Sequence, residues 1–164
     1  MAATRRALIV AGAALLGGCG FALRRTPELQ FRTLQLVGFA PRSSLADELR
    51  RSINASTTTL VVDAAAQAAV QFEALTDARE KSVVASTAAG QVREVQVRAR
   101  LNFSLRTVSG RELIAPTELV LSRDLSYNES VALAKEQEEA LLYRAMQTDI
   151  VAQVMRRLAS VSLL

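Results

Sequence analysis

Few side chains of this 164-residue sequence are suited to chemistry. It contains no histidine and a single cysteine, Cys19, so it offers neither Ser-His-Asp nor Cys-His nucleophilic pairs, nor a histidine-based zinc site. Carboxylates, lysines, tyrosines and hydroxyls remain. Neighbouring acids such as Glu138 and Glu139 point about 100° apart on a helix and form no facing pair. We therefore expect neither an enzyme nor a bound metal or cofactor.

Cys19 lies in a context that is typical of covalent lipid attachment. Arg5 and Arg6 precede an apolar run over residues 7–16, and two glycines then precede the cysteine. A charged start and a short apolar run are typical of a secretory signal peptide, and this run is too short to span a bilayer. The small residue before the cysteine resembles a bacterial lipobox. This resemblance implies that residues 1–18 are removed and that Cys19 is lipidated.

The lipid and the residue after the cysteine predict where the protein resides. Several acyl chains hold a protein on a membrane far more firmly than one, at about 0.8 kcal/mol per buried methylene. Gly20 follows Cys19, and the absence of aspartate there resembles lipoproteins that are sent on to the outer membrane. We expect an outer-membrane protein on the periplasmic side, anchored through acyl chains, with residues 19–28 as a tether.

The composition is that of one folded domain. Hydrophobic residues make up 50% of the chain and charged residues 22%, which is typical of a globular protein. Residues 29–164 are numerous enough to form a single domain with its own core. The net charge is +4, and Arg5 and Arg6 supply two of these charges, so the mature chain carries +2. This excess is too small to favour nucleic acid as a partner.

The clearest periodicity lies in the middle of the chain. Apolar residues occupy alternate positions from Val95 to Leu105, with polar residues between them. A period of two predicts a strand with one buried and one polar face. A Ser-Gly pair at 109–110 supplies a turn, and residues 112–125 return as the next strand. Pro116 marks an edge or a bulge there, because proline cannot donate to a strand ladder.

The first half of the chain alternates strand and helix. We predict strands at 29–37 and 70–79 and a helix from Ser43 or Ser44 to about residue 54, whose leucines and isoleucine recur every four residues. Residues 60–62 form a short extended piece, and 64–69 a helical turn or loop. The order strand, helix, strand favours a parallel pair joined by a crossover, and the second to fourth strands favour an antiparallel meander.

A long second helix closes the chain. Asn128 is suited to cap a helix over residues 129–158. Its apolar residues form one core-facing stripe, made of Leu142, Met146, Ile150, Val154 and Leu158. The complete pattern predicts an α+β two-layer sandwich, with two helices packed on one face of a four-stranded mixed sheet in the order strand-helix-strand-strand-strand-helix.

Four segments, taken in order, carry a family resemblance. They are Cys19-Gly20-Phe21-Ala22-Leu23-Arg24, the hairpin Ala89-Gly90-Gln91, the strand end Arg123-Asp124 and the helix start Ala132-Leu133-Ala134-Lys135-Glu136. Together they resemble the LptE family of lipopolysaccharide-assembly lipoproteins, over nearly the whole chain. The resemblance implies a two-helix, four-stranded domain that sits as a plug inside a large outer-membrane β-barrel, LptD. There it would assist barrel assembly and the delivery of lipopolysaccharide to the outer leaflet.

The resemblance also implies that basic residues bind lipopolysaccharide. Lys135 falls in the matching Ala-Leu-Ala-Lys segment and takes this role directly. A second basic position of the family, just before the Gly-Gln of the hairpin, is Ala88 in this sequence. Lys81 and Arg93 are the cations near the same hairpin that would substitute for it.

Three further arginines lie on the polar side of the alternating strand: Arg98, Arg100 and Arg106. Lipid A presents phosphates, and arginine binds phosphate in a bidentate fork. The same stripe also fits a solvated sheet face or a face against the polar lumen of a barrel, and the sequence leaves these interpretations open. A different function also remains open, that of an accessory lipid-binding lipoprotein of another envelope transport system.

Overall fold

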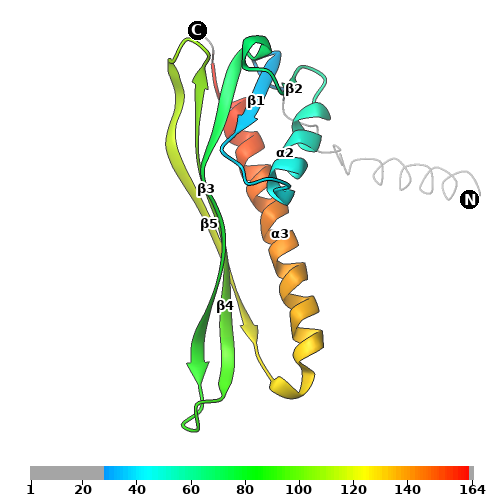
Figure 1. Ribbon diagram of the computed structural model, residues 1–164, viewed down its shortest axis with the longest axis vertical. Coiled ribbons are helices and arrows are strands. Elements are labelled where there is room, and N and C mark those ends of the chain that lie inside the picture. Colours follow the sequence, from blue (N-terminus) through cyan, green and yellow to red (C-terminus); the bar gives the residue numbers. More distant parts are fainter. Residues whose placement is uncertain (1–27, 163–164) are drawn as a thin grey trace, which may run out of the picture.

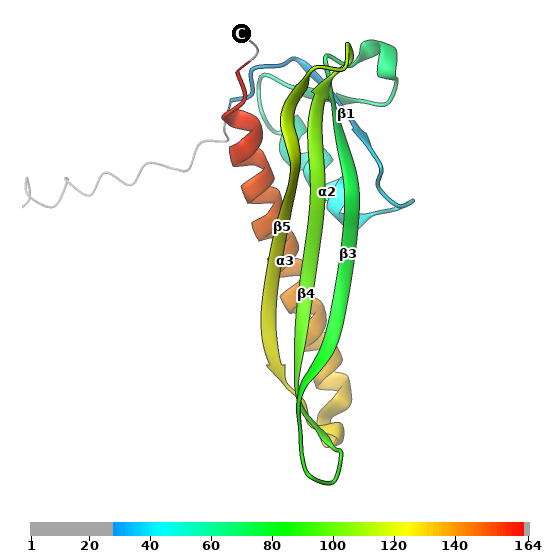
Figure 2. The ribbon, with the colours of Figure 1, turned by 90° about the vertical axis from the view of Figure 1, so that its left-hand side faces the viewer.

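The computed structural model describes residues 28–162 of the chain. Its elements are β1 (Thr33–Val37), α2 (Ser44–Asn54), β2 (Leu60–Val62), the 3-10 turn η2 (Ala65–Gln67), β3 (Val70–Ser86), β4 (Val92–Thr107), β5 (Glu112–Ser126), the 3-10 turn η3 (Glu129–Val131) and α3 (Ala132–Ala159). Within these residues the strands form one sheet in the order β2-β1-β3-β4-β5. Both helices lie on the same face of this sheet (Figures 1 and 2).

The predicted α+β class and the placement of two helices on one face are confirmed. The sheet has five strands rather than four, because Leu60–Val62 pairs in parallel with β1 and forms an edge strand of the sheet. β3 continues to Ser86 instead of ending at about residue 79, since its whole length pairs with β4. The last helix begins at Ala132, after η3, and Asn128 accepts a hydrogen bond from the main-chain N–H of Ser130.

Two local predictions about strand pairing are also confirmed. β1 runs parallel to β3, with Leu34 opposite Val70 and Val37 opposite Glu73. Pro116 lies on β5, which is an edge strand, and the register with β4 shifts across this segment. A residue without an N–H donor is tolerated at such a place because no ladder bond is lost.

The core lies between the helices and the inner face of the sheet. Alternate residues of β4 are buried, and Phe103 stacks on Phe72 of β3 with ring centroids 4.8 Å apart. The stripe of α2 is fully buried, and α3 contributes its own row of buried side chains, among them Met146, Ile150, Val154 and Leu158. The polar positions of β4 lie on the opposite face, which we call the outer face.

The sheet changes width along the length of the molecule. β1 pairs with β3 only as far as Glu73 and then turns away at Gly38, which has a φ of +81°. Beyond this point the sheet consists of β3, β4 and β5 alone, beside the first half of α3 (Figures 1 and 2). We call this part the ribbon end. Neither α2 nor α3, the helices of residues 28–162, is long and apolar enough to cross a membrane.

Candidate functional site

The fold separates the six predicted cations into two groups. Lys81 lies opposite Val97, whose side chain is buried on the helix side of the sheet. Arg93 precedes the buried Val95 by two positions on the same strand, and Lys135 is in the first turn of α3. These three are at the ribbon end. Arg98, Arg100 and Arg106 alternate with buried residues of β4 and are therefore on the outer face.

Lys135 joins the start of α3 to the end of β5. Its Nζ donates to Ser126 Oγ at 3.1 Å and lies 2.9 Å from a carboxylate oxygen of Glu138, one turn along the helix. Only 18% of its side chain is exposed. The Lys135 side chain thus packs against the protein, whereas its partner Glu138 is half exposed.

Lys81 and Arg93 both contact Tyr127, which follows the end of β5. Lys81 Nζ lies 5.9 Å from the centre of the Tyr127 ring and 2.6 Å from Glu139 Oε2. The hydrogen bond to Glu139 raises the pKa of Lys81 above its ordinary value, so this side chain stays positively charged to a higher pH than an ordinary lysine. The main-chain N–H of Tyr127 donates to the carbonyl of Arg93 at 2.8 Å. The structure therefore brings Lys81, Arg93 and Lys135 to one end.

Apolar side chains are exposed at the same end. They are Val83 and Val84 near the end of β3, Val131 in η3 and Leu133 in the first turn of α3, and Leu133 is 71% exposed. Cations beside exposed apolar groups suit a ligand that carries both phosphates and acyl chains, because each part of it finds a matching surface.

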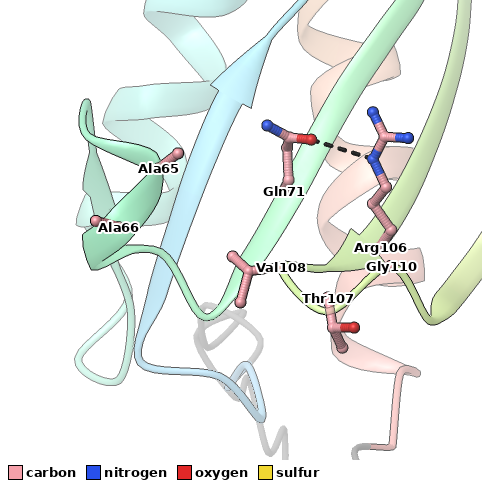
Figure 3. A pocket seen from close by; sticks show the side chains of 7 residues that line it. All are labelled: Ala65, Ala66, Gln71, Arg106, Thr107, Val108 and Gly110. Atoms are coloured by element: carbon pink, nitrogen blue, oxygen red, sulfur yellow. Dashed lines mark hydrogen bonds between the residues drawn. The ribbon is translucent and has the colours of Figure 1, made fainter.

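A shallow cleft of about 390 Å³ lies at the opposite end of the sheet from the ribbon end (Figure 3). Arg106 lines it, and its Nε donates to Gln71 Oε1 at 3.1 Å. The guanidinium also lies 2.6 Å from Glu73 Oε2. The charge of Arg106 is thus met by a carboxylate on the neighbouring strand.

The other two outer-face arginines are also paired. Arg98 and Arg100 lie 3.7 Å and 3.6 Å from the two carboxylate oxygens of Glu80, and Arg100 also lies 3.6 Å from Glu118. The stripe predicted as basic is therefore balanced by acids of β3 and β5. Such a face has many exposed charges of both signs, and it presents no concentrated positive field.

A second cleft of about 540 Å³ lies beside the ribbon on the helix side, between β3 and α3. Its walls are Arg79, Lys81, Glu136, Glu139, Ala140, Tyr143 and Arg144. We call it the β3–α3 cleft. The hydroxyl of Tyr143 donates to the main-chain oxygen of Glu80 at 2.6 Å, and burial, followed by the negative charge of Glu139, raises the pKa of this phenol.

Sequence reasoning did not identify Arg79, Tyr127 and Tyr143. Arg79 precedes Lys81 by two positions, so a strand that continued past residue 79 would have placed both on one face. The two tyrosines carry no distinguishing local pattern. Their roles depend on β5 and α3 returning beside β3, which only the assembled fold shows.

Part of the predicted site lies outside the described residues. Cys19 and residues 1–18, the predicted signal peptide, are not among them, nor is the tether apart from Glu28. Within residues 28–162, no three carboxylate, cysteine or histidine groups come together as a metal site would require.

Solved structures first define the class of protein to which this fold belongs. The solution structure of an uncharacterised lipoprotein B from Nitrosomonas europaea is 30% identical, with a TM-score of 0.73 over 86% of this chain and 91% of that chain. A rare lipoprotein B from Shewanella oneidensis shares the fold at 22% identity, with a TM-score of 0.65 over 79% and 95% of the two chains. The fold is thus that of bacterial lipoproteins.

Sequence comparison then identifies the family. The family model LptE, described as lipopolysaccharide-assembly, matches residues 31–158, and the chain belongs to this family. A protein from Pectobacterium atrosepticum, named LPS-assembly lipoprotein LptE, is 27% identical over 94% of this chain and 85% of its own. One of the same name from Photorhabdus laumondii is 25% identical over 88% and 79%. These relatives are named as assembly lipoproteins and not as enzymes.

Proposed function

We propose that this protein is an outer-membrane lipoprotein that plugs and helps assemble an LptD-type β-barrel and binds lipopolysaccharide during its delivery to the outer leaflet. In this proposal residues 1–18 are the signal peptide, Cys19 carries the acyl chains and residues 19–28 tether a single domain. The observation that carries the proposal is membership of the lipopolysaccharide-assembly family over residues 31–158.

The ribbon end supports the lipopolysaccharide part of this proposal. Lys81, Arg93 and Lys135 gather there from three different elements, and exposed valines and a leucine lie at the same end. The phosphates of lipid A would bind the cations, and its acyl chains would cover Val131 and Leu133. Ala88 lies in the turn between β3 and β4, so Lys81 and Arg93 take the place of the missing hairpin cation.

The outer face supports the barrel part. Its arginines and acids form exposed ion pairs, and a surface of this kind suits the polar, water-filled interior of a large β-barrel. The long, narrow outline of the sheet and α3 also suits insertion along the axis of a barrel (Figure 1).

The barrel partner is tested by affinity purification. A C-terminally tagged copy of the full chain is isolated from detergent-solubilised membranes. We expect a stoichiometric large partner whose electrophoretic mobility changes on heating, as a folded β-barrel's does. Recovery of the protein alone, or with subunits of an inner-membrane transporter, would contradict the proposal.

The lipid anchor is tested by labelling cells with radioactive palmitate. The wild-type protein should incorporate the label, and Cys19→Ala should not, because the chain contains no other cysteine. Equal labelling of the two proteins, or no labelling of the wild type, would refute attachment at Cys19.

A further inference from the structure

The sheet has a vacant strand position at the ribbon end. β1 occupies the place beside β3 as far as Glu73 and then leaves at Gly38. Among the described residues, no strand takes this place along the remainder of β3. The segment Arg79–Val84, which we call the open edge, therefore pairs with β4 on one side only.

The open edge is exposed on both faces, unlike the strand next to it. Every residue from Arg79 to Val84 is exposed, whereas alternate residues of β4 are buried. Val83 and Val84 are 55% and 49% exposed. An exposed edge strand presents main-chain N–H and C=O groups to a further strand, and natural sheets usually obstruct such an edge with proline, a bulge or a covering element.

Such obstruction lies in the middle of the other edge strand, whereas on β3 the register shifts only near the two ends of the segment that follows β1. β5 contains Pro116 and a register shift, and its inward-facing residues Leu119 and Leu125 are buried. On β3 the register shifts between Ala74 and Thr76 and again between Val83 and Ala85, and between these two places it runs without interruption. The one local bond from a side chain to the main chain is that of the Tyr143 hydroxyl to the Glu80 oxygen.

The β3–α3 cleft beside the open edge has cations without carboxylate partners. Arg79 donates to the neutral oxygens of Ser44 and Gln147 and lies 5.4 Å from the centre of the Tyr143 ring. The exposed Arg144 bonds only a carbonyl of its own helix. Lys81 is paired with Glu139, which leaves Glu136 as the remaining acid of the cleft. The cleft as a whole is therefore positive by one charge.

We propose that the open edge of β3 accepts an extended segment of a partner protein as an added strand, with a carboxylate of that segment in the β3–α3 cleft near Arg79 and Arg144. Main-chain hydrogen bonds would supply most of the binding, and side-chain complementarity would select the segment. An open edge of six residues spans about 20 Å, which is an ordinary strand length.

The chemistry of the cleft identifies the occupant as an acidic polypeptide. A strand added beside β3 would continue the line of β1. Alternate side chains of the added strand would therefore point into the cleft, where the cations without carboxylate partners lie. Apolar residues of the segment would cover Val83 and Val84. In the complex proposed above, this segment belongs to the barrel protein, and in that respect the inference rests on the proposed function.

Photo-crosslinking with register mapping tests the inference. Benzoylphenylalanine is placed in the full chain at Ala78 or Ser82, two outer-face positions of β3 that are four residues apart. Ser122, on the outer face of the opposite edge strand, is the matched control. After irradiation of the purified barrel complex, we expect Ala78 and Ser82 to crosslink to one partner segment at positions four residues apart, and Ser122 not to crosslink to that segment.

Each other outcome contradicts the inference. Crosslinks without this constant spacing would show that the contact is not a strand. Crosslinks to a second copy of this chain, or to lipopolysaccharide, would assign the edge to a different occupant. A recovered barrel without a crosslink from β3 would refute strand addition and leave the proposed function intact, whereas failure to recover any barrel would refute the proposed function itself.

A charge reversal gives an independent measurement. Arg144→Glu should reduce the amount of barrel recovered per lipoprotein by about threefold, the size of an exposed charge effect. The control is Arg156→Glu, which reverses an exposed arginine of the same helix away from the cleft. If the two variants recover equal amounts of barrel, no carboxylate of the partner segment binds near Arg144.

Discussion

Lys81 and Tyr143 both interact with Glu139 and both hold their protons more tightly in the folded protein than ordinary side chains do. The hydrogen bond to Glu139 raises the pKa of Lys81, and burial raises that of Tyr143. For each group the protonated form is favoured by folding. Their contribution to the free energy of unfolding is therefore complete below a pH of about 10 and is lost as the pH rises above it.

The raised pKa values of Lys81 and Tyr143 predict how single variants behave at alkaline pH. The chain has two tyrosines, so Tyr127→Phe leaves Tyr143 as the only phenol. Its absorbance titration should be centred above a pH of about 10, and in urea it should return to the ordinary value. Tyr143→Phe should reduce the loss of stability above that pH. A titration that is the same in native and unfolded protein would contradict the burial of this phenol.

A second residue-scale prediction concerns Gly38, where β1 ends. Its φ is +81°, and a Cβ at this position would lie 2.2 Å from the main-chain oxygen of Ala74. Gly90 has the same φ but no atom within 4 Å of such a Cβ. Gly90→Ala should therefore cost about 1 kcal/mol for its backbone conformation alone, whereas Gly38→Ala should cost at least about 2 kcal/mol more. Urea denaturation measures both, and equal losses would show that Gly38 is not in close contact with β3.

At the scale of elements, Gln147 joins α3 to α2 and β3. Its amide nitrogen donates to the Ser44 carbonyl and to Glu48, and its oxygen accepts from Ser44 Oγ at 2.7 Å and from Arg79 at 2.7 Å. All hydrogen-bonding capacity of the amide is thus used. The side chain is mostly buried, so its partners would not all regain water if it were removed.

Replacement of Gln147 by methionine tests this connection. Gln147→Met keeps the volume but removes four hydrogen bonds, so we expect a loss of about 2–3 kcal/mol in the free energy of unfolding. Glu136→Gln, an exposed change on the same helix, should be nearly neutral. If Gln147→Met and the wild type have the same midpoint of urea unfolding, the hydrogen bonds of Gln147 do not stabilise the packing of α2 against α3.

The elements that were predictable from sequence are those with one buried face. The alternation in β4 and the apolar stripes of α2 and α3 arise because one face of each element is buried, and the structure confirms these patterns. β3 beyond residue 79 shows no such pattern in the sequence. α3 packs against β4 and β5, so both faces of this part of β3 are exposed. β2 is only three residues long, so its pairing with β1 also left no periodic signal.

The candidate site was less predictable than the fold, for a related reason. The charged residues were visible in the sequence, but their ion-pair partners come from other strands. Glu80 and Glu118 balance the arginines of β4 only because three strands align. Lys135 was predicted from the family resemblance alone, and its contact with Ser126 depends on the connection from β5 to α3.

At the scale of the whole molecule, the two groups of cations differ in what surrounds them. The outer-face arginines are each matched by acids of adjacent strands, whereas at the ribbon end Lys81 and Lys135, which are paired with glutamates of α3, lie at the same end as exposed apolar groups. A lipid with phosphates and acyl chains requires both kinds of group in one place. A barrel interior requires only a well-hydrated polar surface. In the proposed function, this arrangement would separate the lipid-binding cations of the ribbon end from the outer face, which would contact the barrel.

This separation predicts opposite results for two sets of variants. Lys81→Gln together with Lys135→Gln should weaken the binding of the full-length lipoprotein to immobilised lipopolysaccharide by about tenfold, because two charge-assisted phosphate contacts are lost. Arg98→Gln, Arg100→Gln and Arg106→Gln combined should leave that binding unchanged, although this set removes more positive charge. Dependence on total charge alone would instead make the triple variant the weaker binder. That result would contradict a specific lipopolysaccharide site at the ribbon end.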